Sequence, residues 1–204
     1  MSEYMKKTII FDLGWVYFTD WTKHAIETIS KIYNISQENV KNVLKWELGT
    51  KYRIGELTAE EFWSKAKEFR WLNVPSAELA NIWLEEYKPI PGTAKIIDRL
   101  NKALYEIIFL SDNVQERIDY LQAKYPFLDK FKWGVFSHLV KTRKPDPKIY
   151  ELALNEASNK AGECIYIDDK LELLEPAKLM WMKTIHFQTV EDLEKSLKDL
   201  GLKF

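Results

Sequence analysis

Short apolar runs that end abruptly in polar residues recur along the chain. Three of them, at 8–11, 107–110 and 164–167, are followed directly by Asp12, Ser111 and Asp168. A short apolar run of this kind is typical of a strand that is buried in a parallel sheet. The same pattern predicts two weaker strands at 134–136 and 184–187.

Segments with helical spacing of apolar residues lie between and after these runs. Helices are predicted over 94–104, 115–125, 147–157, 173–182 and 191–200. Thr189 and Asp192 have the spacing of a capping box, and Asp146 before Pro147 is typical of an N-cap followed by proline at the first helical position. Strands that alternate with helices predict an α/β fold with a Rossmann-like, doubly wound parallel sheet.

The stretch 18–89 interrupts this alternation, because it contains amphipathic helical segments and no convincing strand. Its predicted helices cover 21–33, 37–48, 59–70 and 76–87. Thr58 and Glu61 form a capping box at the start of the third. We therefore predict an inserted all-helical cap at 18–89 and a core formed by 1–17 and 90–204.

Composition and charge narrow the classes of function. The 30 Lys and Arg nearly cancel the 31 Asp and Glu, so no overall field attracts nucleic acid or an anionic membrane. The single cysteine, Cys164, excludes an internal disulfide and a metal site built from several thiolates. The first residues lack the long apolar stretch of a signal peptide. We expect a cytoplasmic protein, monomer or homodimer, that acts on a small molecule.

Polar residues at the ends of the predicted strands suggest the chemistry. In an open parallel sheet, ligands bind at the carboxyl ends of the strands. Asp12, Ser111 and the pair Asp168–Asp169 would meet there, with Lys144 in a nearby loop. Carboxylates that can hold a hard cation, together with an ammonium and a hydroxyl, suit phosphoryl transfer, in which repulsion between anions must be neutralised.

The proposed reaction assigns a role to each of these residues. Asp12 would attack phosphorus as a nucleophile, and Asp12 and Asp169 would supply carboxylate ligands to Mg2+. Ser111, with backbone amides near Leu13 and Gly14, would bind the phosphate oxygens.

Four short segments, in this order, resemble the motifs of the haloacid dehalogenase superfamily. They are FDLGWV at 11–16, LSDN at 110–113, RKPD at 143–146 and YIDD at 166–169. Each segment is weak alone, but four in order around a helical insertion form a strong joint signal. The resemblance implies a hydrolase with a Rossmann-like core, and Mg2+ as the cofactor of its phosphatases.

The resemblance also implies roles for individual residues. Asp12 would be nucleophile and metal ligand, with the carbonyl of Gly14 and the carboxylate of Asp169 as further ligands. Asp168 would orient Lys144.

By the same resemblance, Ser111 and Asn113 would bind or frame the phosphate. The insertion is similar to the helical cap of a branch that includes sugar-phosphate phosphatases and the amino-terminal domains of soluble epoxide hydrolases. The segment at 55–58, GELT, is typical of that branch. The implied substrate is a small phosphorylated metabolite, such as a sugar phosphate.

Two positions depart from the usual pattern of the superfamily. Most of its phosphatases carry a second aspartate two residues after the nucleophile, which protonates the leaving oxygen, but this chain has Gly14 there. The absence of this general acid predicts slower turnover, a substitute acid from the cap, or a substrate with a good leaving group. Trp15, where a small residue is usual, would narrow the pocket or stack on a substrate.

Two alternatives remain open at this point. The first is a 2-haloacid dehalogenase, in which the same aspartate attacks carbon without a metal. The second is a catalytically weakened member that binds a phosphorylated ligand or a protein partner, with Gly14 and Trp15 as marks of decay.

Aromatic residues outside the motifs divide into two groups. Four tryptophans fall at helical spacing among apolar residues, which predicts core packing: Trp46, Trp63, Trp83 and Trp181. Tyr17 and Trp21, at the start of the cap, are candidates for contact with the substrate.

The remaining candidates are interpreted as structural. Asp112 is expected to face solvent, and Cys164 is expected to pack as a small apolar residue in its strand. The three histidines, His24, His138 and His186, have no spacing that indicates a metal site.

Overall fold

A five-stranded parallel sheet organises the structure. The computed structural model describes residues 7–19, 22–69, 76–85 and 87–204. The strands within these ranges are β1 (Thr8–Phe11), β2 (Glu106–Ser111), β3 (Trp133–Phe136), β4 (Cys164–Asp168) and β5 (Lys183–His186). They lie in the order β3-β2-β1-β4-β5, and every neighbouring pair is parallel. The predicted fold class is confirmed, and each predicted strand matches to within one residue at either end.

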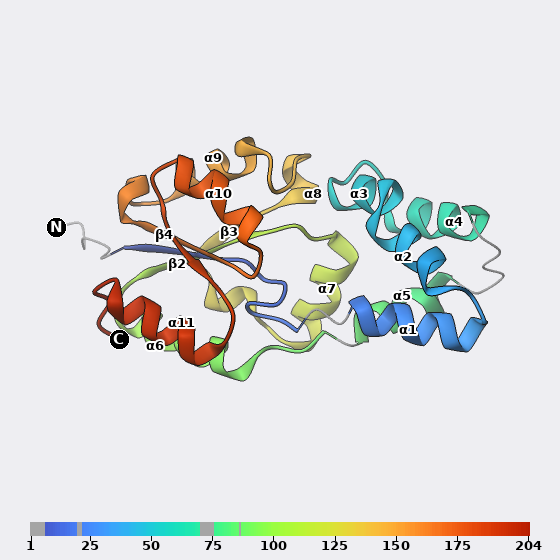
Figure 1. The fold of residues 1–204 in the computed structure, drawn as a ribbon, viewed down its shortest axis with the longest axis horizontal. Helices are drawn as coiled ribbons and strands as arrows, with labels where there is room; N and C mark the ends of the chain where they lie inside the picture. Colours follow the sequence, from blue (N-terminus) through green and yellow to red (C-terminus); the bar gives the residue numbers. More distant parts are fainter. Residues whose placement is uncertain (1–6, 20–21, 70–75, 86) are drawn as a thin grey trace.

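Helices cover both faces of this sheet (Figure 1). One face carries α6 (Pro91–Lys102) and α11 (Val190–Asp199), and the other carries α9 (Pro147–Glu156) and α10 (Leu171–Leu179). In β1, Ile9 packs with the first pair of helices and Ile10 with the second, because side chains alternate along a strand. Burial on both faces explains why the strands are continuous apolar runs.

The predicted helix caps are present. The Thr189 hydroxyl accepts a hydrogen bond from the backbone nitrogen of Asp192 at 3.1 Å. The Thr58 hydroxyl accepts from the Glu61 nitrogen at 3.2 Å, and the Glu61 carboxylate accepts from the Thr58 nitrogen at 2.8 Å. These reciprocal bonds satisfy backbone donors that a helix start otherwise leaves without partners.

The insertion forms a helical unit at one end of the molecule (Figure 1). Its described helices are α1 (Thr22–Tyr33), α2 (Gln37–Lys45), α3 (Glu47–Arg53), α4 (Ala59–Phe69) and α5 (Ser76–Glu85). They enclose a separate apolar cluster that includes Phe62 and Trp83. The helical unit therefore buries its own apolar residues, so it covers the end of the sheet with a hydrophobic core separate from that of the α/β core.

One predicted helix in the insertion is wrong in its extent. The helix expected over 37–48 ends at Lys45, and α3 begins at Glu47, because Trp46 leaves the helical conformation (φ −88°, ψ −143°). The short helix α8 (Ser137–Val140) and the 3-10 turns at Leu128–Lys130 and Ala161–Glu163 were not predicted, since such short elements lack a full period of the pattern.

The chain enters and leaves the insertion side by side. Phe18 and Pro89 form an antiparallel bridge, and the Ile90 nitrogen donates to the Tyr17 carbonyl at 2.7 Å. Phe18 and Tyr87 pack in the cluster of the α/β core. The division of the chain at residues 18 and 89 stays a prediction.

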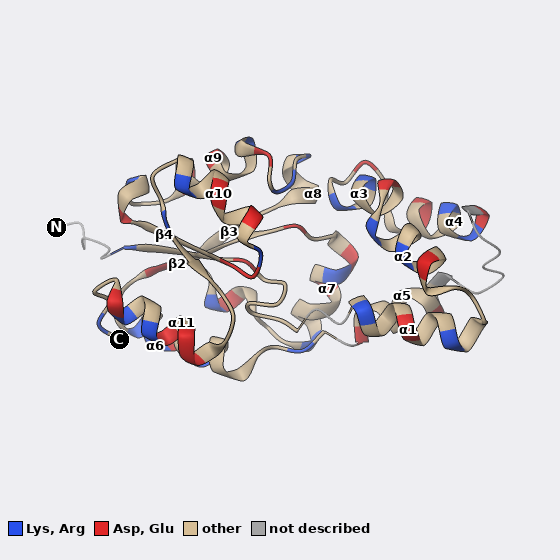
Figure 2. Cartoon of the chain, in the orientation of Figure 1, with Lys and Arg blue, Asp and Glu red and all other residues tan. Residues whose placement is uncertain are grey.

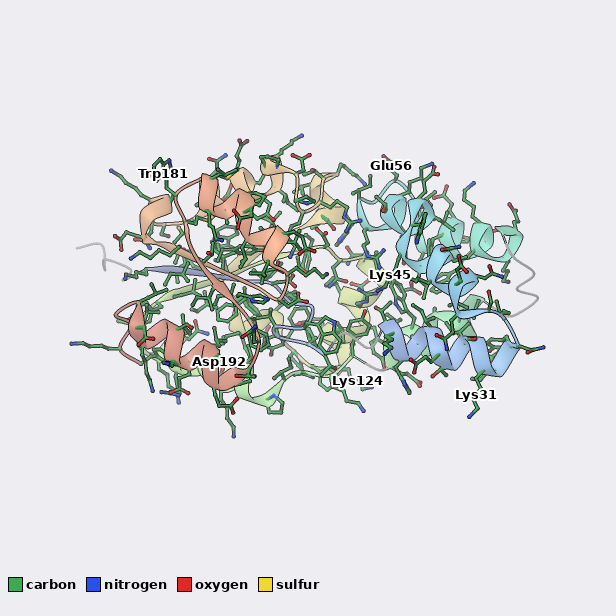
Figure 3. The ribbon with its side chains drawn as sticks, viewed as in Figure 1. Lys31, Lys45, Glu56, Lys124, Trp181 and Asp192 are labelled. Atoms are coloured by element: carbon green, nitrogen blue, oxygen red, sulfur yellow. The ribbon has the colours of Figure 1, made fainter. Side chains whose placement is uncertain are left out.

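The tryptophan predictions are half right. Trp63 and Trp83 are buried, but Trp46 is 65% exposed at the break between α2 and α3, and Trp181 is 83% exposed. Trp181 follows α10 with a positive φ of 67°, at the end of the molecule away from the insertion (Figure 3). Both exposed rings lie where a helix ends, so the helical period no longer directs them inward. Cys164 is fully buried in β4, as predicted.

Charged residues of both signs are interspersed over the outer helices (Figure 2). Both signs also occur at the end of the sheet that faces the helical unit. No helix in the described part of the chain combines the length and the hydropathy that crossing a bilayer requires.

Candidate active site

The three central strands bring their carboxyl ends together beneath the helical unit. Asp12 follows β1, which lies between β2 and β4 in the sheet. Ser111 is the last residue of β2, and Asp168 is the last residue of β4. Parallel pairing places Phe11 beside Phe109 and Ile167, so the residues that follow these positions emerge at the same edge. A pocket of about 420 Å³ opens at this edge.

Lys144 is buried between two carboxylates at the floor of the pocket. Its Nζ donates to Asp12 Oδ1 at 2.8 Å and to Asp168 Oδ2 at 2.7 Å. It lies 3.1 Å from the Tyr166 hydroxyl, which in turn donates to Asp168. Burial alone lowers the pKa of Lys144, but Asp12, Tyr166 and Asp168 outweigh it and keep the pKa well above the usual value. The ammonium is therefore charged and fixed in position.

The pKa values of the carboxylates at this edge of the sheet shift in opposite directions. Burial raises the pKa of Asp12 to about 7, against the attraction of Lys144, and repulsion from Asp168 adds to the rise. Burial also raises the pKa of Asp169. For Asp168, burial is outweighed by Lys144 and by hydrogen bonds, which lower the pKa. The cluster therefore contains more negative charge than Lys144 neutralises, and a further cation would relieve it.

Asp12, Asp168 and Asp169 offer carboxylate oxygens within 4.8 Å of one another. Asp168 is already bonded to Lys144, and its Oδ1 accepts from the Lys170 nitrogen at 3.0 Å. Asp12 and Asp169 are the carboxylates best placed to hold an ion. Oxygen donors of this type and number fit a hard divalent cation such as Mg2+.

Ser111 and Asn113 line the pocket beside Asp12, and both are buried. The Asn113 Oδ1 accepts from the Val114 nitrogen at 3.0 Å and from Arg117 Nη1 at 3.3 Å. Its NH2 group is therefore the end of the amide that can donate to a ligand. The Ser111 hydroxyl and this amide suit the oxygens of an anion.

Asp112 corrects a prediction, because it does not face solvent. Its side chain is 14% exposed and pairs with Arg143 Nε at 3.2 Å. Its Oδ1 also accepts from the Lys144 backbone nitrogen at 3.0 Å. Asp112 thus fastens the loop that delivers Lys144. The parallel pairing of β2 with β3 brings Asp112, just after β2, near the loop that carries Lys144, so the local sequence carried no signal of this contact.

Tyr166 was missed, although a signal existed. Residues two apart on a strand point to the same side, so Tyr166 shares the side of β4 that carries Asp168. Its hydroxyl contacts both Lys144 and Asp168, and it completes the polar network at the pocket floor.

The segment after Asp12 forms part of the pocket wall. Leu13, Gly14 and Trp15 all line the pocket, and Trp15 is 43% exposed with a positive φ of 57°. Tyr17, a candidate for substrate contact, is instead 2% exposed and packs edge-on against Phe131 in the core. That prediction is wrong, because the turn after Asp12 directs Tyr17 inward. Trp21 lies outside the described residues.

Comparison with known proteins identifies the family. The family model of haloacid dehalogenase-like hydrolases matches residues 15–179. The chain belongs to the haloacid dehalogenase-like hydrolases. The family inferred from the four motifs is confirmed, and so is the expectation that the protein is a hydrolase.

Individual relatives of this haloacid dehalogenase-like hydrolase are distant in sequence. A sesquiterpene phosphatase of Aspergillus oryzae is 24% identical over 191 residues, which cover 88% of this chain and 89% of the relative. A family enzyme of Bacteroides thetaiotaomicron, solved with magnesium and inorganic phosphate, has a TM-score of 0.79 at 19% identity, covering 89% of this chain and 94% of that one. The L-2-haloacid dehalogenase of Xanthobacter autotrophicus has a TM-score of 0.65 at 17% identity, covering 96% and 83%. These structural likenesses concern the fold.

Proposed function

We propose that this hydrolase is a magnesium-dependent phosphatase that cleaves a small phosphomonoester through an aspartyl-phosphate intermediate. The observation that carries the proposal is the buried Lys144 ammonium, bonded to both Asp12 and Asp168 at the carboxyl edge of the sheet. In this arrangement the Asp12 carboxylate lines the pocket, and the Asp169 carboxylate lies beside it.

The relatives support the same reaction class. The Bacteroides enzyme was solved with magnesium and inorganic phosphate, and the Aspergillus relative is named a phosphatase. In this chain, Asp12, Asp169 and the carbonyl of Gly14 would hold the magnesium ion. When bound, the ion supplies positive charge that lets an anionic nucleophile approach an anionic phosphate.

The chain's own residues account for the remaining steps. An oxygen of Asp12 attacks phosphorus, a new P–O bond forms, and the bond to the alcohol oxygen breaks with its electron pair. Ser111 and the Asn113 amide donate hydrogen bonds to the phosphoryl oxygens, and Lys144 offsets their charge. Water then attacks the same phosphorus, the bond to Asp12 breaks, and phosphate leaves. A proton from solvent reaches the alcohol, and a proton of the water passes to solvent.

Gly14 affects which substrates react well. No carboxyl group stands at this position to protonate the leaving oxygen, so the rate depends strongly on how good the leaving group is. We propose a small polar alcohol as the leaving group, such as a sugar, from the resemblance of the insertion to sugar-phosphate phosphatases. The cytoplasm is proposed as its location on the evidence of the single cysteine.

Phosphate release with and without magnesium tests the reaction. The wild-type protein should release inorganic phosphate from p-nitrophenyl phosphate when Mg2+ is present, and complete chelation should abolish the activity. Activity that survives chelation contradicts the proposal. Release of chloride from 2-chloropropionate without a metal would support the dehalogenase alternative instead.

Replacement of Asp12 tests the nucleophile. Asp12→Asn should lower kcat for p-nitrophenyl phosphate by at least ~1000-fold, because an amide cannot form the covalent intermediate. Asp119→Asn is the matched control, since Asp119 is exposed on helix α7 (Gln115–Lys124) outside the pocket. Equal rates for Asp12→Asn and the wild type would favour a binding protein that is no longer catalytic.

A further inference from the structure

Arg117 is a buried cation in the wall of the pocket that the proposed reaction does not use. It lies in the first turn of α7 (Gln115–Lys124), the helix that follows the Ser111 strand, and its side chain is 5% exposed. It lines the pocket together with Thr22 and Tyr87, on the side of the helical unit. A buried arginine is costly unless its charge and its N–H groups are satisfied.

The partners of Arg117 satisfy it only in part. Its guanidinium carbon lies 3.9 Å from the ring centre of Trp83 and 4.4 Å from that of Tyr87. Nη1 donates a long hydrogen bond of 3.3 Å to Asn113 Oδ1. Nε and Nη2 are buried without a hydrogen-bond partner among the described residues. Within the same ranges, no carboxylate forms an ion pair with this side chain.

The rest of the pocket wall is also rich in cations. The basic residues that line it are Lys45, Arg53, Arg117, Arg143, Lys144 and Lys170, and the acidic ones are Asp12, Asp112 and Glu172. Arg143 pairs with Asp112, and Lys144 pairs with Asp12. Of the other basic residues, Lys170 precedes α10, Arg117 lies on α7, and Lys45 and Arg53 lie on the insertion, where Lys45 is on the side toward the core (Figure 3).

We propose that Arg117 binds a second anionic group, a carboxylate or a phosphate, on the alcohol part of the substrate. The inference rests on the proposed phosphatase function, which places the reacting phosphate at Asp12. The two aromatic rings hold the planar guanidinium in place, and such a fork matches the paired oxygens of a carboxylate or phosphate. Asn113 connects the two ends of the pocket, because it contacts Arg117 and flanks the proposed phosphate site.

Matched pairs of substrates test this inference on the wild-type protein. The first pair is 3-phosphoglycerate and glycerol 3-phosphate, which differ by a carboxylate in place of a hydroxymethyl group. The second pair is fructose 1,6-bisphosphate and fructose 6-phosphate, which differ by a phosphate. A charge-assisted contact predicts a kcat/KM that is roughly tenfold to a hundredfold higher for the member with two anions, in at least one pair. The pair that shows the preference identifies the anion.

Variants of single residues show which side chain causes the preference for the substrate with two anions. Arg117→Gln should remove most of it: kcat/KM should fall roughly tenfold to a hundredfold more on the doubly anionic member of the pair than on p-nitrophenyl phosphate, which has no second anion to bind. Lys124→Gln is the matched control: Lys124 lies on the same helix, contacts the Tyr120 and Tyr125 rings, lies on the outside of the molecule (Figure 3) and does not line the pocket. It should keep the full preference. If Arg117→Gln does not fold, Arg117→Lys replaces it in the test. This variant keeps the positive charge but loses the planar fork of donors, so it should retain only part of the preference.

A binding measurement separates this inference from the proposed reaction. Calorimetry on Asp12→Asn with Mg2+ present should show tighter binding of 3-phosphoglycerate than of glycerol 3-phosphate, or of the bisphosphate than of the monophosphate, whether or not the wild type turns them over. Equal kcat/KM and equal affinity within both pairs would overturn the role of Arg117 and leave the phosphatase proposal intact. A higher kcat/KM for farnesyl phosphate, an apolar probe with a single phosphate, than for every doubly anionic probe would also overturn it. An equal loss of kcat/KM on all substrates in Arg117→Gln would do the same.

Discussion

At the scale of single residues, the site is defined by charges that are buried close together. The Lys144 ammonium forms ion pairs with both Asp12 and Asp168, and Asp169 adds a carboxylate that has no bond to Lys144. Asp112 fixes the backbone of Lys144 from another loop. Side chains are therefore assigned to the nucleophile, to cation binding and to phosphate binding, but none is assigned to protonate the leaving alcohol or to take a proton from the attacking water.

Restoring an acid at Gly14 should change the preference for leaving groups. A Cβ at Gly14 would lie 3.7 Å from Asp12 Oδ2, which is an ordinary contact, so Gly14→Asp fits the backbone. We expect the ratio of kcat/KM for glycerol 3-phosphate to that for p-nitrophenyl phosphate to rise roughly tenfold to a hundredfold, because only the alkyl ester needs a proton. Steady-state kinetics measure this ratio. Gly14→Asn has the same size but no acidic proton, and an equal rise in that variant would refute the explanation.

At the scale of elements, the sheet is joined at the end opposite the pocket by another buried acid. Glu106 begins β2 and accepts hydrogen bonds from Thr8 in β1, from Lys132 before β3, and from Ser158 after α9. Burial alone would raise its pKa, but these bonds outweigh burial and lower it from 4.5 to about 2. One carboxylate thus ties together the starts of two strands and a loop.

The depressed pKa of Glu106 predicts a dependence of stability on acid. Since the folded pKa lies below the unfolded one, the contribution of Glu106 is complete above about pH 5 and is lost as the pH falls toward 2. It amounts to about 3 kcal/mol in the free energy of unfolding.

Urea unfolding of the wild type and Glu106→Gln between pH 7 and pH 3 measures this contribution. The difference between the two proteins should shrink as the pH falls. Glu151→Gln, on the exposed side of α9, is the control and should unfold like the wild type. A difference that stays constant with pH would show that the charge of Glu106 does not matter.

At the scale of the whole molecule, α7 connects the helical unit with the α/β core. Val114, just before α7, packs in the cluster of the helical unit. Glu116 accepts hydrogen bonds from the Tyr52 hydroxyl at 2.7 Å and from Trp63 Nε1 at 3.1 Å. The same segment follows Ser111, so the phosphate end of the pocket and the packing of the insertion share one support.

Magnesium should stabilise the folded protein if the carboxylate cluster binds it. A ligand at 100 times its Kd adds about 2.7 kcal/mol, which for a chain of this size raises Tm by roughly 5–10 °C. Thermal unfolding with and without Mg2+, at matched ionic strength, measures the shift. Asp169→Asn should lose most of it, while Asp119→Asn should keep it. An equal shift in both variants would place the ion elsewhere.

The sequence alone determined the parts of this protein that depend on local pattern. Apolar runs between polar residues specified all five strands of the described residues, and four ordered motifs specified the family and predicted residues that line the pocket beside Asp12. These inferences succeed because a parallel sheet buries both faces of its strands and exposes their carboxyl ends at one edge.

Only the tertiary structure decided which side chains meet across long stretches of chain. It turned Tyr17 into the core, attached Asp112 to the Lys144 loop, and left Arg117 between two aromatic rings in the pocket wall. The physical reason is that periodicity fixes which side of an element is buried, whereas the packing of distant elements fixes the partners that a charge or ring finds there.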